Sequence, residues 1–363
     1  MTLQSRERNI RSAICVYRNE GTSGADLWPG GTMLQFRRSA IVMVAATALV
    51  SLTGCGVVAS EQGSFDRTLT VSGPARLELS NGSGAVQITG GQSGKIHVHA
   101  EVRVQGLLFG NPQERLADII SNPPIEQRGD TIRIGKDGPR LRNVSITYTI
   151  EVPRETEVEA SVGSGSQELR DVRGPVKLSS GSGSIHAQKI ERSATFTTGS
   201  GSVEAGDLGD DVRASTGSGT ITLSGVKGEV RSSTGSGTIH VSSSGGRVEV
   251  TTGSGSITVT GASNDVNVRT ASGTIRVAGN PAASSTWEMH TASGSVELIV
   301  PPTANFLFSA NAVSGGISTD IPIVVEEQGR HELRARLGNG GARVQVRTVS
   351  GGIRLRGSNS AAL

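Results

Sequence analysis

The stretch Gly217-Ser-Gly-Thr-Ile-Thr-Leu-Ser-Gly-Val-Lys-Gly-Glu-Val-Arg-Ser-Ser-Thr234 is followed at once by a second Gly-Ser-Gly-Thr-Ile, and this recurrence decides the fold. The same phrase, with Ser or Thr in fourth place, begins every 18 residues, at Gly163, Gly181, Gly199, Gly217, Gly235, Gly253 and Ala271. An unbroken period of this length is typical of a stacked-repeat protein, in which each unit buries its apolar side against its neighbours.

Each unit alternates apolar and polar residues when the first residue of the phrase is counted as position 0. Position 4 is Ile or Val, position 6 is Ala, Leu or Val, and the residue between them is polar or charged. This alternation predicts a short strand at positions 4–7 with one apolar face. A second strand is predicted at positions 13–17, where positions 13 and 15 are mostly Val, Ala or Leu.

Two strands in the same phase in every unit predict an all-β fold, a single-chain parallel β-solenoid with 18-residue coils. Each strand pairs with its copy about 4.8 Å away in the next coil, and stacking joins the apolar columns into one core. We expect the glycines to form sharp corners with positive φ. The threonines at position 17, such as Thr198 and Thr252, are expected to bond to one another along the stack.

The pattern becomes irregular towards both ends, so residues 161–291 are predicted as regular coils, 64–160 and 292–357 as irregular ones, and 358–363 as a tail. Upstream, residues 77–88 fit one coil in the same register. Asn111 followed by Pro112 predicts a helix over 112–121, which we expect to cap an open sheet edge.

The C-terminal coils keep the phrase at wider spacings. It returns at Ala292, Val313 and Val349, and Trp287 and Met289 fall on inward columns, where we expect them to fill the core.

The N-terminal region contains a predicted export signal. Arg37-Arg38 precedes an apolar run of about 13 residues that is too short to favour a membrane span. The run ends in Leu52-Thr53-Gly54-Cys55, which resembles the bacterial lipoprotein lipobox. The resemblance implies cleavage before Cys55 and a diacylglycerol on its sulfur. Residues 33–54 are then the signal peptide, 1–32 an upstream extension and 55–63 a lipidated tether.

Removal of the leader changes the charge of the protein. Residues 1–54 contain six Arg against two Glu and one Asp, a net +3, which equals the net +3 of the whole chain. The mature chain is therefore near neutral, and nucleic-acid binding, which needs a basic face, is not expected.

Residues with catalytic or metal-binding chemistry are scattered. His97 and His99 lie two apart on a predicted strand, as half of a metal site would, but no carboxylate is close in sequence. His186 and Glu204 are one coil apart and allow a surface hydrogen bond. The glycine pairs lead into strands and lack a P-loop lysine or the aspartates of calcium-binding coils. We expect no metal, no cofactor and no catalytic residue.

An outward column at position 16 is rich in hydroxyl groups and is the candidate binding face, together with two arginines at position 14. The residues are Ser179, Thr197, Ser215, Ser233, Thr251, Arg213 and Arg231.

Several segments together resemble the "putative adhesin" family of bacterial β-solenoid domains of unknown function, which are related to head-domain adhesins. They are Asn81-Gly82-Ser83-Gly84, Ile150-Glu151-Val152-Pro153, the repeated corners, and Thr348-Val349-Ser350-Gly351-Gly352-Ile353. The resemblance spans about residues 64–357 and implies a surface or envelope binding protein without catalytic residues.

The leading hypothesis is a lipid-anchored, non-catalytic adhesin or binding scaffold of the cell envelope. Its expected partners are the membrane, through Cys55, and envelope glycans or surface proteins. Gly56 is not the Asp that, by resemblance to Gram-negative sorting rules, retains lipoproteins in the inner membrane, so such an organism would place it in the outer membrane. Two alternatives stay open: a polysaccharide-active β-helix enzyme, and a structural or stress-associated envelope component.

Overall fold

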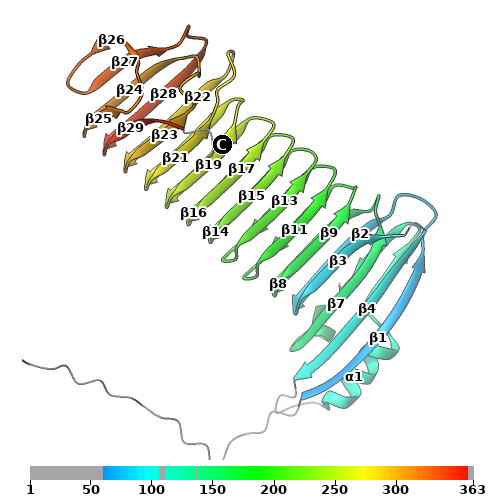
Figure 1. Ribbon diagram of the computed structural model, residues 1–363. Helices are drawn as coiled ribbons and strands as arrows, with labels where there is room; N and C mark the ends of the chain where they lie inside the picture. Colours follow the sequence, from blue (N-terminus) through cyan, green and yellow to red (C-terminus); the bar gives the residue numbers. More distant parts are fainter. Residues whose placement is uncertain (1–59, 93, 106–110, 136–137, 359–363) are drawn as a thin grey trace, which may run out of the picture. The chain divides into compact units, whose positions relative to one another are not determined.

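A computed structural model describes residues 60–92, 94–105, 111–135 and 138–358, all within the compact unit 56–363. The predicted leader and lipobox therefore lie outside the described residues. These residues form two long sheets whose strands stack coil upon coil (Figure 1), one of 14 strands and one of 15. The predicted all-β, solenoid-like fold of parallel strands is confirmed.

The two sheets, called A and B here, take alternate strands of each coil. Sheet A contains β1 (Ser60–Thr70), β3 (Val86–Gly91), β4 (Lys95–Gln105), β7 (Val144–Pro153), β9 (Gln167–Val172), β11 (Ile185–Ile190), β13 (Val203–Leu208), β15 (Ile221–Val226), β17 (Ile239–Ser244), β19 (Ile257–Ala262), β21 (Ile275–Gly279), β23 (Val296–Val300), β25 (Ile317–Thr319) and β29 (Ile353–Gly357). Sheet B contains β2 (Arg76–Ser83), β5 (Ile125–Arg128), β6 (Thr131–Ile134), β8 (Glu157–Ser164), β10 (Val176–Ser180), β12 (Ala194–Thr198), β14 (Val212–Ser218), β16 (Val230–Ser236), β18 (Val248–Ser254), β20 (Val266–Ser272), β22 (Thr286–Ser293), β24 (Phe306–Ser314), β26 (Val324–Gln328), β27 (Glu332–Leu337) and β28 (Ala342–Ser350).

The core is the set of inward columns that the periodicity predicted. In the regular coils each strand pairs in parallel with the strand 18 residues away, so that Val212 lies beside Val230 and Ile221 beside Ile239. Trp287 and Met289 are fully buried, as predicted. The indole N–H of Trp287 donates to the carbonyl of Asn264 at 2.7 Å, which satisfies the one polar atom of this ring.

A third inward column lies at position 9, which the alternation did not predict. In most regular coils the residue at position 8 adopts positive φ, for example Asp171 (58°), Lys189 (55°) and Asp207 (56°). This left-handed residue places two successive side chains outward, so that the next one turns back into the core. The residues of the column are Val172, Ile190, Leu208, Val226, Ser244 and Ala262, all buried.

The Gly-Ser-Gly corners need glycine for two different reasons. At the first glycine φ is not positive, but a Cβ on Gly181 would lie 2.5 Å from the carbonyl oxygen of Gly163 in the next coil. Close stacking of backbones therefore excludes a side chain there. The second glycine of later corners, such as Gly255 (φ 149°), also adopts the positive φ that the sequence predicted.

The buried threonines at position 17 bond to these corners and not to one another, which corrects the prediction. The Thr198 hydroxyl donates to the carbonyl of Gly183 in the neighbouring coil at 3.1 Å and accepts from the N–H of Gly201 in its own coil at 3.1 Å. From Thr234 to Thr291 the hydroxyl oxygens of this column have no partner among the described residues. There the corner N–H groups donate to serine carbonyls of the next coil instead, as Gly237 does to Ser254.

At both ends the order of the coils in the stack departs from the order of the chain. The coil β2–β3 lies between β8–β9, which follows it by about 80 residues, and the outer strands β6 and β7. At the other end β28–β29, the last coil of the chain, lies between β22–β23 and β24–β25. Each end therefore contains one inserted coil.

Helix α1 (Pro112–Ser121) has the predicted bounds, and Asn111 accepts a hydrogen bond from the N–H of Gln113 as its N-cap. It contacts β1 and β4, and Leu116 and Ile119 are buried. It covers the apolar face of these strands, whereas β1 remains the sheet edge, so the predicted capping of an edge is wrong. A short 3-10 helix, η1 (Gly138–Leu141), is the other helical segment of the described residues. β1 begins at Ser60, within the segment assigned to the tether.

Candidate functional site

The hydroxyl column lies on the outer face of sheet B, one residue per strand from β10 to β18. Parallel pairing places its five members in register: Ser179, Thr197, Ser215, Ser233 and Thr251. All are exposed or half-exposed. The Ser215 hydroxyl donates to the Thr197 hydroxyl at 3.4 Å, a distance that leaves the pair weakly bonded and available to a ligand. The structure therefore brings these five predicted residues into one straight row.

Two arginines flank this row and differ in their contacts. Arg231 lies between two carboxylates, at 3.0 Å from Glu229 and 3.4 Å from Glu249. Arg213, its neighbour on β14, forms no ion pair among the described residues. Of the two predicted arginines, Arg213 is therefore the one whose guanidinium can bind an external group without losing a partner.

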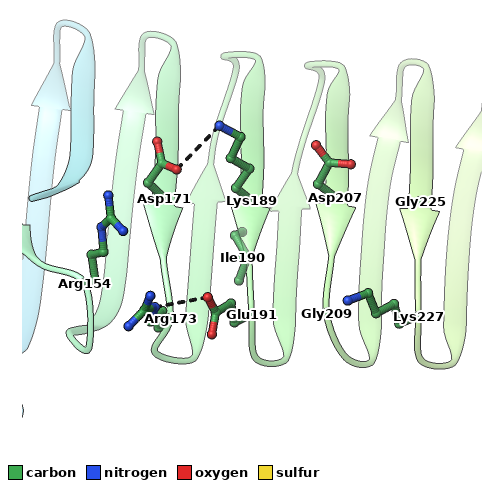
Figure 2. A pocket seen from close by; sticks show the side chains of 10 residues that line it. All are labelled: Arg154, Asp171, Arg173, Lys189, Ile190, Glu191, Asp207, Gly209, Gly225 and Lys227. Carbon is green, nitrogen blue, oxygen red and sulfur yellow. Dashed lines mark hydrogen bonds and ion pairs between the residues drawn. The ribbon is translucent and has the colours of Figure 1, made fainter.

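A groove of about 560 Å³ follows the corner after the sheet A strands (Figure 2). Its charges alternate along the stack, and Lys189 lies 3.7 Å from Asp171 while Arg173 lies 3.0 Å from Glu191. Hydrogen bonds and the charges of Glu155 and Glu191 raise the pKa of Arg173. The side chains that could bind a ligand here are thus largely neutralised by each other.

The aspartates near this groove shape the turn, as expected from their sequence. Asp207 adopts positive φ, and the carboxylate of Asp211 accepts the N–H of Glu229 from the next coil at 2.7 Å.

The two histidine arrangements of the sequence have different outcomes. His186 and Glu204 are adjacent, with Nδ1 3.3 Å from the carboxylate, the surface contact that was predicted. Asp66 on β1 lies opposite His99 at 2.8 Å and within 3.7 Å of His97, a carboxylate that sequence reasoning missed because antiparallel pairing brings it in. Within the part of the chain described, no set of three His, Cys, Asp or Glu side chains is arranged to hold a metal.

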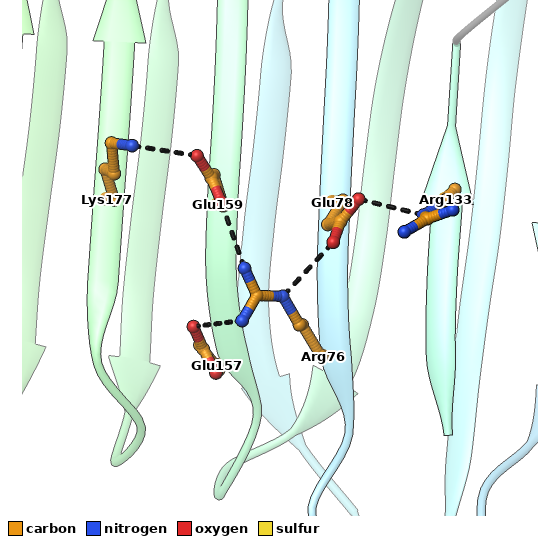
Figure 3. A network of polar contacts seen from close by, with 6 residues as sticks. All are labelled: Arg76, Glu78, Arg133, Glu157, Glu159 and Lys177. Carbon is orange, nitrogen blue, oxygen red and sulfur yellow. Dashed lines mark hydrogen bonds and ion pairs between the residues drawn. The ribbon is translucent and has the colours of Figure 1, made fainter. Parts of the chain in front are cut away.

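A network of ion pairs crosses four strands at the N-terminal end (Figure 3). The Arg76 guanidinium on β2 contacts Glu157 at 2.9 Å and Glu78 and Glu159 at 3.2 Å each. Glu78 continues to Arg133 on β6 at 2.9 Å, and Glu159 to Lys177 on β10 at 2.9 Å. The hydrogen bond from Lys177 lowers the pKa of Glu159. The network ties the inserted coil to both neighbours, which is a structural role.

Residues 208–356 match the family described as Toastrack DUF4097. This is the C-terminal part of the region in which the sequence resembles adhesins, and it extends from β14 to β29. No curated protein matches the chain. Among the described helices, none has the length and apolar character needed to cross a membrane.

Three crystal structures are similar to the chain at low identity. A "putative cell adhesion protein" from Clostridium sporogenes ATCC 15579 is 10% identical, covering 82% of this chain and 100% of that one, with a TM-score of 0.21. A "putative lipid binding protein" from Parabacteroides distasonis ATCC 8503 is 14% identical over 80% and 96%, with a TM-score of 0.34. A "putative adhesin" from Bacteroides fragilis NCTC 9343 is 10% identical over 81% and 97%, with a TM-score of 0.29. Likenesses of this size carry no argument about function.

Proposed function

We propose that the chain is a lipid-anchored, non-catalytic binding scaffold of the cell envelope, with an adhesin-like role. The observation that carries the proposal is the row of five outward hydroxyls in register on sheet B. Rows of this kind offer the same contact once per coil, about every 4.8 Å. Several weak contacts along one rigid face add to a useful affinity for a repetitive ligand.

The chemistry of the row suits a hydroxyl-rich polymer, so envelope glycans are the proposed ligand class. Serine and threonine hydroxyls both donate and accept, and the Arg213 guanidinium adds donors beside them. A fully packed core supports this face: inward neighbours such as Val212 and Phe196 are 2% exposed or less. The binding surface is therefore rigid before the ligand arrives, which limits the entropy lost on binding.

Glycan and cell-wall arrays test this proposal, with the full chain carrying Cys55→Ser as a detergent-free form. We expect saturable binding to at least one glycan, weakened at least fivefold by Thr197→Asp combined with Ser233→Asp. The matched control is Thr222→Asp with Thr258→Asp, two outward residues of sheet A. Equal binding by both double variants would overturn the role of this row, and turnover of a polysaccharide would support the enzyme alternative.

The anchor is proposed from the lipobox alone. A diacylglycerol on Cys55 supplies two chains, enough for stable attachment to a membrane. Native protein is expected in the membrane fraction, and the Cys55→Ser variant in the soluble fraction. An unchanged distribution of the Cys55→Ser variant would refute the anchor.

A further inference from the structure

The Gly-Ser-Gly corner loses its first glycine towards the C-terminal end of the stack. On successive strands β18, β20, β22, β28 and β24, position 0 is occupied by Gly253, Ala271, Ala292, Val349 and Val313. Val313 and Val349 are 59% and 56% exposed, the largest fractions among the exposed large apolar side chains of the described residues. Chain order hides this row, because Val349 lies between Ala292 and Val313 only after insertion of the last coil.

A row of basic side chains runs beside these corners, one position 16 residue from each strand. Arg269, His290 and Arg347 are adjacent in register, with Thr251 and Asn311 at the two ends. Arg269 lies 3.8 Å from Glu288, and Arg347 forms no ion pair with any described residue. Burial and the charges of Arg347 and Arg269 lower the pKa of His290, which indicates a positive potential at the centre of the row.

The two rows enclose a groove of about 610 Å³, within the size range of small-molecule sites. The groove crosses five strands, so its length is about 19 Å at about 4.8 Å per step. Its apolar floor has little hydrogen-bonding capacity, because the N–H groups of Gly273, Gly294 and Gly351 already donate to serine carbonyls of the next coil at 2.8–2.9 Å.

We propose that this groove binds an anionic amphiphile, with a single acyl chain along the corner and an acidic head group at Arg347 and Arg269. An acyl chain needs no hydrogen bonds over the length of the groove. An extended peptide is disfavoured because its N–H and C=O groups would find no partners there. A second copy of this face is disfavoured because it would oppose arginine to arginine. The site is separate from the glycan role proposed above.

The test uses the full chain carrying Cys55→Ser, titrated with dodecanoate and a fluorescent dansyl-undecanoate probe below their micelle concentrations. We expect saturable binding of one molecule per chain. Dodecanol and dodecyltrimethylammonium have chains of the same length with neutral and cationic heads, and they should bind at least tenfold more weakly than dodecanoate. Equal binding of the three would overturn recognition of an anionic head.

The variant Val313→Asp/Val349→Asp should weaken dodecanoate at least tenfold, and Arg269→Gln/Arg347→Gln should do the same. The matched control is Val324→Asp/Val325→Asp, because these valines on β26 are also exposed, at 55% and 47%, but lie outside the groove. The milder Val349→Thr keeps the side-chain shape should the aspartates disturb folding. Three outcomes would overturn the proposal: equal losses in groove and control variants, binding to phosphatidylglycerol vesicles without binding of monomers, or self-association through the valines.

Discussion

The central coils and the two ends of the stack use the same strands but different connections. In the centre the partners of a strand lie 18 residues away on either side, as β14 pairs with β12 and β16. At the ends, ion pairs join residues much farther apart in sequence: Arg76 and Glu157 are 81 residues apart, and Arg356 and Glu297 are 59. The centre can therefore lose or gain a coil without affecting connectivity, whereas an inserted coil holds together segments that are not consecutive.

The largest expected effect compares deletion of residues 342–357 with deletion of 217–234. The first removes the inserted coil with Val344, Val346, Ile353 and Leu355; the second removes one regular coil with Ile221, Leu223, Val226 and Val230, all of them buried. Each set contributes about 6–12 kcal/mol, four side chains at about 1.5–3 kcal/mol each.

Only the second deletion leaves every remaining strand a neighbour in the original register. Limited proteolysis and thermal unfolding should therefore show a folded Δ217–234 chain. The Δ342–357 chain should be cleaved between residues 301 and 341, since Trp287 would meet Phe306 without the small residues of β28 between them. Equal resistance of the two deletions would contradict the locking role of the inserted coil.

A smaller effect separates the two kinds of corner within the regular coils. Thr198→Val removes two hydrogen bonds of a buried hydroxyl and should cost about 1–2 kcal/mol in urea unfolding. Thr252→Val has the same shape change, but its hydroxyl has no partner among the described residues. It should change the free energy of unfolding by less than about 0.5 kcal/mol or raise it. A larger loss for Thr252→Val than for Thr198→Val would show that the corners are equivalent.

The smallest effect concerns pH at the C-terminal end. Because the pKa of His290 is lowered in the folded chain, the unfolded chain takes up this proton first as the pH falls below about 6.5. Stability should therefore decrease from that pH down through the folded-state pKa, and His290→Gln should flatten this part of the profile. His240, an exposed histidine of the central coils, provides the control as His240→Gln. An identical pH profile for wild type and His290→Gln would contradict the expectation.

The sequence predicts the coils well because their information is local. Alternation at positions 4, 6, 13 and 15 identifies the strands, and Asn111-Pro112 locates the helix. The column at position 9 escapes detection because its cause, a left-handed residue at position 8, is Asp, Lys, Gly or Ser in different coils.

The order of the end coils could not be predicted, because the columns do not specify neighbours. Val344 fits the column of Trp287 as well as that of Phe308, and the structure places it beside both. The same limit hid the groove, whose corner row is continuous only in stacking order. Likewise Asp66 meets His99 through antiparallel pairing across 33 residues, for which the repeat gives no signal.

The inserted C-terminal coil also affects when the protein can be finished during its synthesis. A regular solenoid can add coils one after another as the chain emerges, each new coil completing the last. Here β22–β23 and β24–β25 are both made before the coil that fills the space between them. The stack is therefore closed only when residues 342–357 arrive, so that a chain ended early by premature termination is left with an exposed seam that a quality-control protease can recognise.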